Sequence, residues 1–275
     1  MSQDRSESLL QAVAEVARRA GQVALSRFRT RLDVETKRDG SPVTVADRAA
    51  EAAAREWIAA RFPDDSVLGE EFGAVGDDTR RRWLIDPIDG TKSFIRGVPL
   101  WGTLIAVARG DDVLAGAVFC PAVDEMVAAA MGEGCWWNGA RSRVSAVADV
   151  GAATVLITDD RFPNRPERAR CWTELATGAA VARTWGDCYG YLLVATGRAE
   201  VMADDLMSPW DAAALVPVVL EAGGAFSDWD GRVTAFGNGA IATNGALAGT
   251  VRSRLGVPWP GGGGAGGAAT GRSHA

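Results

Sequence analysis

The chain has 275 residues and a formal net charge of −6, with 47% hydrophobic and 23% charged residues. This is the balance of a globular protein with a sizeable core, and the length suits one large domain or two packed halves. An acidic chain offers no basic face to a nucleic-acid backbone, so we expect no nucleic-acid partner. No run of about 18 uncharged apolar residues occurs, so we expect no membrane-spanning helix and no membrane partner.

Two residue types narrow the chemistry. The four cysteines are widely spaced and form no CxxC pair, which is typical of free thiols in a reducing compartment. The N-terminus lacks the pattern of a secretory signal, so we expect a cytoplasmic protein. The single histidine, His274, is the next-to-last residue, which excludes histidine-dependent triads, zinc sites and general bases. Chemistry must rest on carboxylates, hydroxyls, lysines and metals with oxygen ligands.

The first part of the chain predicts two helices and then several strands. Apolar residues at helical spacing predict helices over about 7–28 and 44–61, with a polar turn at 37–42 between them. Short strands are predicted over 82–86, 102–108, 113–119 and 126–131. Asn138-Gly139 is a hairpin signal. We interpret residues 1–145 as an α+β half.

After about residue 146, strands and helices alternate. Strands are predicted over 155–158, 180–184 and 200–203, and two more precede a last helix. Further helices are predicted over 166–177, 187–196 and 209–222. An α+β half followed by an α/β half, at 146–257, predicts an α/β protein of layered helices and sheets. The glycine-rich end has nothing to bury, so we expect a disordered tail over 258–275.

The densest candidate site is the string from Asp86 to Thr91, Asp-Pro-Ile-Asp-Gly-Thr. A strand delivers Asp86 at its end, Pro87 fixes the chain direction and the turn presents Asp89 beside it. The free amides that follow could hold an anion. Two carboxylates beside an anion site suit Mg²⁺ held against a phosphate. Taken alone, however, such a string is more often a surface turn.

Two further acidic positions accompany this string. Gly69-Glu70-Glu71 follows a short apolar stretch, which places carboxylates at the end of a strand. Trp210-Asp211 opens an otherwise apolar helix, where an aspartate is by itself a favourable helix-start charge. In order and spacing, the three strings resemble the inositol monophosphatase-like family, over about residues 7–255. This resemblance implies a layered αβαβα sandwich of the inositol monophosphatase/fructose bisphosphatase type.

The resemblance also implies a role for each matching residue. The carboxylates of Glu70, Asp86, Asp89 and Asp211 and the carbonyl of Ile88 would bind metal. The Gly90 and Thr91 amides would bind phosphate, with Lys37 near the phosphate entrance. Asp47 would pair with the Thr91 hydroxyl, and Thr91, aligned by Asp47 or Glu70, would orient or deprotonate the attacking water. The implied cofactor is Mg²⁺, as two or three ions, and the implied assembly is a homodimer.

The resemblance extends to a particular branch. Arg183 to Tyr191, together with Thr91 to Gly97, looks like the histidinol-phosphate phosphatase branch. Such a substrate carries an ammonium and an imidazole, so it needs a carboxylate and a flat aromatic wall. Asp187 and Asp204 could supply the charge, and Trp185 and Tyr189 the wall. The competing interpretations are a helix cap for Asp187 and core packing for the two aromatics.

Several alternatives stay open at this stage. Lys92 and Arg96 could contact phosphate, although solvated surface charge is the commoner fate. An inositol monophosphatase or broad sugar-phosphate phosphatase is the second function, and an adenosine bisphosphate phosphatase the third. A non-catalytic metal-binding or regulatory protein of the same fold is disfavoured, because it would have no reason to keep every ligand.

Overall fold

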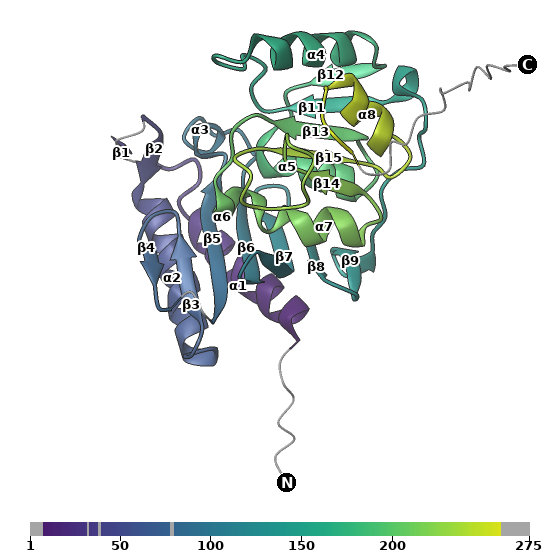
Figure 1. Ribbon diagram of the computed structural model, residues 1–275. Coiled ribbons are helices and arrows are strands. Elements are labelled where there is room, and N and C mark those ends of the chain that lie inside the picture. Colours follow the sequence, from purple (N-terminus) through teal and green to yellow (C-terminus); the bar gives the residue numbers. More distant parts are fainter. Residues whose placement is uncertain (1–7, 32, 38–39, 78–79, 260–275) are drawn as a thin grey trace, which may run out of the picture.

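The computed structural model describes residues 8–31, 33–37, 40–77 and 80–259, and these residues form five alternating layers of helices and sheets (Figure 1). The outer helices on one side are α1 (Leu9–Leu25) and α2 (Val45–Arg61). The central layer holds α5 (Asp187–Ala195), α6 (Pro209–Ala212) and α7 (Leu215–Glu221). The opposite outer layer holds α4 (Pro166–Thr177) and α8 (Ala248–Arg254). The layers have the predicted order αβαβα.

An eight-stranded sheet separates the first helical layer from the central one. Its strand order is β10-β9-β8-β7-β6-β5-β3-β4. The strands are β3 (Ser66–Gly69), β4 (Gly73–Val75), β5 (Arg81–Asp89), β6 (Gly102–Arg109), β7 (Asp112–Cys120), β8 (Glu125–Ala130), β9 (Gly134–Trp137) and β10 (Ala140–Arg141). All neighbours are antiparallel except β3 and β5, which run parallel. Short α3 (Thr91–Phe94) follows β5 directly.

A five-stranded sheet lies on the other side of the central helices. Its order is β12-β11-β13-β15-β14. The strands are β11 (Thr154–Ile157), β12 (Val181–Arg183), β13 (Val201–Asp204), β14 (Ala225–Ser227) and β15 (Ala240–Thr243). A 3-10 helix, Val150–Ala152, precedes β11, and β11 is parallel to both β12 and β13. The division of the chain into two halves near residue 145 remains our proposal.

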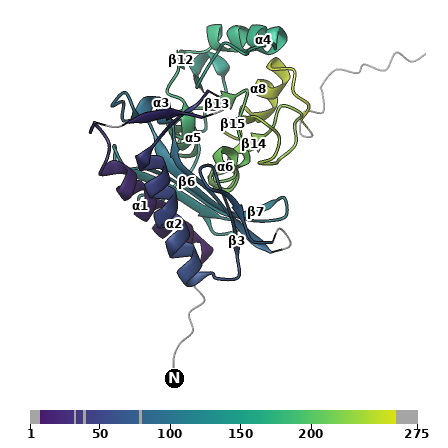
Figure 2. The same cartoon turned by 90° about the vertical axis from the view of Figure 1, so that its left-hand side faces the viewer.

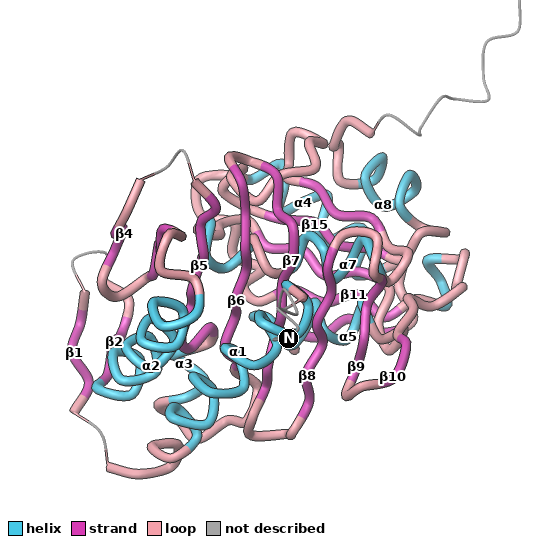
Figure 3. The backbone as a smooth tube through the Cα atoms, turned by 90° about the horizontal axis from the view of Figure 1, so that it is seen from below, coloured by secondary structure: helices cyan, strands magenta, loops and turns pink. Residues whose placement is uncertain are grey.

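Helices α1 and α2 cover one face of the large sheet, as Figures 2 and 3 show. The buried side of α1 carries small and β-branched residues such as Val13, Val16 and Ala20. At Gly21, a Cβ would lie 2.6 Å from the Phe119 ring, so only glycine lets this helix approach the sheet so closely. The opposite face of the sheet is turned toward the central helices, and the residues that form the site lie on that side (Figure 2).

The structure differs from the predicted elements in three places. Two short strands that were not predicted, β1 (Val34–Thr36) and β2 (Pro42–Thr44), flank the predicted polar turn, of which residues 38 and 39 lie outside the described residues. Strand β4 was also missed. The single helix predicted over 209–222 is two helices, α6 and α7. Pro217 has no N–H to donate to the Ala213 carbonyl, so the helical hydrogen bonds are interrupted between α6 and α7.

The ends of the chain test two further predictions. Within the described residues, no helix combines the length and apolarity needed to cross a membrane. The predicted tail begins at residue 258, but Pro258 and Trp259 are described, and the Trp259 ring lies 4.1 Å from the Arg252 guanidinium. The rest of that prediction, 260–275, lies outside the described residues.

Candidate active site

Two carboxylates stand side by side because the strands that carry them are parallel. Gly69 of β3 lies opposite Ile85 of β5, so the following residues, Glu70 and Asp86, occupy the same edge of the sheet. The Glu70 amide donates a 3.1 Å hydrogen bond to the Ile85 carbonyl. A Cβ on Gly69 would lie 2.0 Å from Oε1 of Glu51. Only glycine therefore lets the end of β3 lie this close to the Glu51 side chain.

A β-bulge turns Asp86 and Asp89 to the same face. Side chains alternate along a strand, so residues three apart normally point to opposite faces. Here Asp86 lies opposite Leu104 and Asp89 lies opposite Gly102, so three steps along β5 match two along β6. The bulge contains Pro87, which a regular central strand would not tolerate. The extra residue therefore brings both carboxylates to the side of the central helices.

The central helices supply the opposite wall. Asp211 is the third residue of α6, and its Oδ2 accepts a 2.8 Å hydrogen bond from the Ser208 amide. Oδ2 of Asp89 accepts a hydrogen bond from the Cys188 amide in the first turn of α5. Asp187 begins α5 with a φ of 50°, in the left-handed region. Carboxylates from β3, β5, α5 and α6 thus converge on one region.

Burial and mutual repulsion raise the pKa values of these acids. Burial, with repulsion from Glu70, Asp89 and Asp211, raises the pKa of Asp86 well above its usual range. Burial, with repulsion from Asp187 and Asp211, does the same to the pKa of Asp89. Burial, with repulsion from Glu70, raises the pKa of Asp211 to about 6. A divalent cation would relieve this repulsion, and the donors are oxygen atoms of the kind Mg²⁺ prefers.

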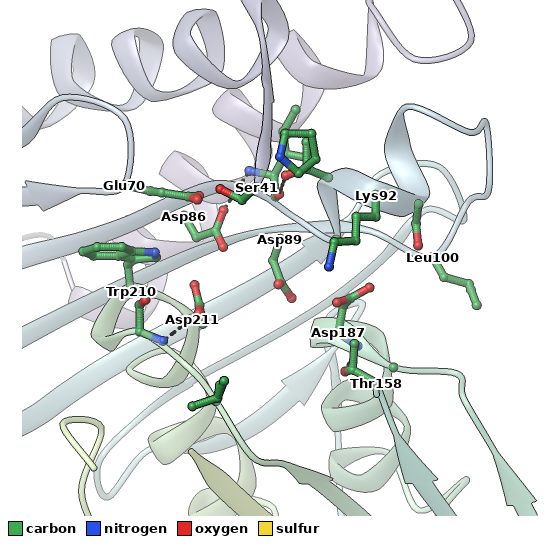
Figure 4. A pocket seen from close by; sticks show the side chains of 18 of the residues that line it. Ser41, Glu70, Asp86, Asp89, Lys92, Leu100, Thr158, Asp187, Trp210 and Asp211 are labelled. Carbon is green, nitrogen blue, oxygen red and sulfur yellow. Dashed lines mark hydrogen bonds between the residues drawn. The ribbon is translucent and has the colours of Figure 1, made fainter. Parts of the chain in front are cut away.

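The carboxylates line a pocket of about 630 Å³, and Figure 4 shows Asp86, Asp89 and Asp211 directed toward one another across it. A second hollow of about 300 Å³ adjoins it. Asp187 lines both, whereas Asp204 lines the second alone. The site therefore has two compartments, with Asp187 on the wall that they share.

The predicted pairing of Asp47 with the Thr91 hydroxyl is not formed in this structure. The Thr91 hydroxyl donates a 2.9 Å hydrogen bond to the Ile88 carbonyl. Oδ2 of Asp47 accepts hydrogen bonds from the amide and the hydroxyl of Thr44, because a spacing of three residues closes a capping box on α2. Oδ1 of Asp47 is buried without a partner. Burial, with repulsion from Glu70, raises the pKa of Asp47, so it does border the site.

Lys37 and Glu70 bind each other. Nζ of Lys37 lies 2.7 Å from Oε1 of Glu70 and 2.7 Å from Oε1 of Glu71. Lys37 is not among the residues that line the pocket. Among the described residues, no three Asp, Glu, His or Cys side chains surround one point closely enough to form a ready-made metal site. Glu70 is held by Lys37, and Asp89 is held by the Cys188 amide.

The structure brings neither residue of the predicted aromatic wall to a hollow. Trp185 is 44% exposed and lines neither hollow. Tyr189 donates a 3.2 Å hydrogen bond to Glu125 and packs against the central core. Residues two apart on a helix point in nearly opposite directions, so Tyr189 faces away where Asp187 faces the pocket.

Asp204 is placed at the second hollow but is engaged by the protein. Its Oδ1 accepts a 3.1 Å hydrogen bond from the Thr158 amide, and its Oδ2 accepts a 3.0 Å hydrogen bond from the Tyr191 hydroxyl. Burial raises the pKa of Asp204 to about 7. Its carboxylate therefore borders the hollow with both oxygens already bonded.

Two further residues line both hollows: Lys92, which the sequence already offered as a possible phosphate contact, and Thr158, which was not predicted. Of the two cations named for that role, Lys92 lines the pocket and Arg96 does not. Thr158 directly follows β11, and its hydroxyl accepts a 2.7 Å hydrogen bond from the Asp187 amide. Because β11 and β13 are parallel, Thr158 and Asp204 meet at the same sheet edge. Thr158 and Asp204 are 46 positions apart, so local sequence patterns could not predict that they lie side by side.

The fold and this carboxylate arrangement agree with a family comparison. The model of the inositol monophosphatase family matches residues 5–255. The chain belongs to this family, whose members are metal-dependent phosphatases, and it is a phosphoric monoester hydrolase. The histidinol-phosphatase of Chlorobaculum parvum (strain DSM 263 / NCIMB 8327) is 44% identical over 249 residues, which cover 90% of this chain and 96% of that protein.

Two further comparisons agree with this assignment. The histidinol-phosphatase of Mycobacterium tuberculosis (strain ATCC 25618 / H37Rv) is 40% identical over 255 residues, covering 90% of this chain and 98% of that protein. The crystal structure of the extragenic suppressor protein suhB from Bartonella henselae superposes with a TM-score of 0.85 at 27% identity, covering 90% of this chain and 98% of that one. The predicted family, fold class and enzyme class are confirmed.

Proposed function

We propose that this phosphatase hydrolyses histidinol phosphate to histidinol and phosphate, with Mg²⁺ as cofactor. The observation that carries the proposal is the two-compartment acidic pocket, with Asp187 on the wall that its compartments share. A phosphate ester whose alcohol part is cationic fits such a pocket: the phosphate lies against the metal carboxylates, and the ammonium lies against a separate carboxylate. The two histidinol-phosphatase relatives support the same substrate.

In this proposal, Glu70, Asp86, Asp89, Asp211 and the Ile88 carbonyl hold two or three Mg²⁺ ions. These mutually repelling carboxylates, of which Asp86 is buried and the others are partly buried, fit such a cofactor. When bound, Mg²⁺ neutralises the phosphate, lowers the pKa of water and stabilises the departing oxygen. The described residues include no histidine, so in this proposal the activation of water rests on the metal ions.

The remaining residues bind and orient. The amides of Gly90 and Thr91 hold the phosphate, and the Thr91 hydroxyl with Glu70 orients the attacking water. Asp47 supports this region through its buried carboxylate beside Glu70, and Lys37 neutralises Glu70 at the pocket edge. Asp187 receives the substrate ammonium, and Asp204 borders the hollow that takes the imidazole.

Phosphate release from a panel of esters tests this function. The panel is L-histidinol phosphate, myo-inositol 1-phosphate, fructose 1,6-bisphosphate, adenosine 3′,5′-bisphosphate, glycerol 2-phosphate and p-nitrophenyl phosphate, each with Mg²⁺. We expect histidinol phosphate to lead the other alkyl esters by about a hundredfold in kcat/KM, on the order of 2.7 kcal/mol of discrimination. Similar rates for all alkyl esters would instead make the chain a broad-specificity phosphatase.

Thermal unfolding tests the metal site independently of activity. A carboxyl group whose pKa is raised in the folded state stabilises the fold below its unfolded pKa, and this stability is lost as the pH rises through the folded value. For Asp211, that window runs from about 4 to about 6. We therefore expect the Mg²⁺-induced rise in Tm to be larger at pH 7.5 than at pH 5, by about 5 °C. An equal rise at both pH values would contradict the assignment.

Location and assembly are also part of the proposal. The four cysteines are free, which is in keeping with a reducing compartment such as the cytoplasm. A homodimer is proposed from the family resemblance alone, and light scattering would measure it.

A further inference from the structure

Lys92 occupies a special position in the two-compartment pocket. It is the second residue of α3 and lines both hollows. Among the described residues that line either hollow, it is the only lysine or arginine. Figure 4 shows its side chain extending from α3 with the ammonium directed toward Asp89 and Asp187. One positive charge thus stands at the junction of the two compartments.

The ammonium of Lys92 has no direct partner among the described side chains. Other cations near the site are engaged: Lys37 binds Glu70, and Arg161 binds Asp159. Lys92 makes no comparable ion pair in the described part of the chain, although its charge acts on Asp187, where it opposes the larger effect of burial on the pKa. An available ammonium facing an acidic pocket is suited to an anionic group of a substrate.

The position of Lys92 indicates which atom of the substrate it meets. In the proposed function, on which this inference rests, the phosphate lies beside Asp89 and the alcohol part lies beyond Asp187. The ester oxygen joins these two parts, so it lies where the compartments meet. Lys92 is the cation at that junction.

We propose that Lys92 is a catalytic residue whose ammonium donates a hydrogen bond to the ester oxygen of the substrate. In the reaction, the oxygen of water bonds to phosphorus while the bond from phosphorus to the ester oxygen breaks. The ester oxygen keeps that electron pair and finally takes a proton that derives from the water. Lys92 is protonated before and after the reaction. Its hydrogen bond strengthens as negative charge grows on the departing oxygen, so it lowers the barrier more than it strengthens substrate binding.

The dependence on the leaving group tests this role. Lys92→Met is compared with the unaltered protein on the alkyl ester of the panel that is hydrolysed fastest and on p-nitrophenyl phosphate. We expect kcat for the alkyl ester to fall about thirtyfold, equivalent to about 2 kcal/mol. The aryl ester should lose less than about threefold, because its departing oxygen carries little charge that needs stabilising. KM should change little for either ester.

Two measurements separate this role from its alternatives. Inhibition by inorganic phosphate, which has no ester oxygen, should be altered less than about threefold by Lys92→Met. Arg96→Met is the matched control, because Arg96 is on the same short segment and exposed but lines neither hollow. Lys92 is also exposed, so the variant is expected to fold.

The following outcomes would overturn the proposed role of Lys92 at the ester oxygen. Equal losses for alkyl and aryl esters would indicate a structural role, and weaker inhibition by phosphate that matches the loss in rate would indicate ordinary phosphate binding. If another alkyl ester is hydrolysed but histidinol phosphate is not, the proposed substrate falls while the comparison of leaving groups still decides Lys92. Absence of hydrolysis of every ester would overturn both.

Discussion

Asp89→Asn is expected to lower kcat/KM by at least about a thousandfold, on the order of 4 kcal/mol. Asp89 is partly buried at the bulged end of β5 and faces Asp187 and Asp211. Removal of its charge takes away a proposed ligand of the metal ions that neutralise the phosphate. Phosphate release at saturating Mg²⁺, from the best substrate of the panel, measures the effect.

The stability of this variant distinguishes a lost metal site from a damaged fold. Asparagine has the same shape and can still accept the hydrogen bond from the Cys188 amide. One repelling charge is removed, so without metal the variant should be at least as stable as the unaltered protein at pH 7.5. Its Mg²⁺-induced rise in Tm should be largely lost. Asp111→Asn, in an exposed turn, is the control. Activity above about a tenth of the original would contradict the assignment.

Asp187→Asn is expected to lower kcat/KM for histidinol phosphate by about a hundredfold, while esters of uncharged alcohols lose less than about threefold. A hydrogen bond between two charged groups contributes about 1.5 to 3 kcal/mol, and only the cationic substrate can form one with this carboxylate. Burial raises the pKa of Asp187 to about 6, so it is largely ionised at pH 7.5. The measurement is the ratio of kcat/KM for histidinol phosphate and glycerol 2-phosphate.

The choice of asparagine protects the backbone at this position. Asp187 has a φ of 50°, and asparagine adopts the left-handed region more readily than most residues. Asp159→Asn is the matched control, because Asp159 lines the second hollow but its carboxylate is bound by Arg161 at 2.7 and 2.9 Å. Equal losses for charged and uncharged esters would show that Asp187 does not select the substrate.

Local patterns in the sequence were enough to predict most of the secondary structure and the kind of chemistry. The helix predicted over 166–177 matches α4 residue for residue, because Pro166 marks its start and Gly178 its end. The absence of an internal histidine left carboxylates and metal as the means of hydrolysis. The helical pattern did not reveal the break after Ala212, where Pro217 has no N–H to donate to the Ala213 carbonyl. The β1–β2 hairpin was too short and polar to give a strand signal.

The sequence by itself therefore determined the family and the phosphatase class, and it pointed to carboxylates that line the pocket (Glu70, Asp86, Asp89 and Asp211), since these depend on residue types in a fixed order. Only the tertiary structure decided which side chains share a face. The sequence predicted Asp89 beside Asp86 through a turn, whereas the structure achieves this with a β-bulge at Pro87, and helical geometry turns Tyr189 away from Asp187. The position of α3 at the end of β5 brings Lys92 to the junction of the two hollows. The physical reason is that a side chain's direction depends on the register and packing of its element against distant segments, which short-range patterns do not record.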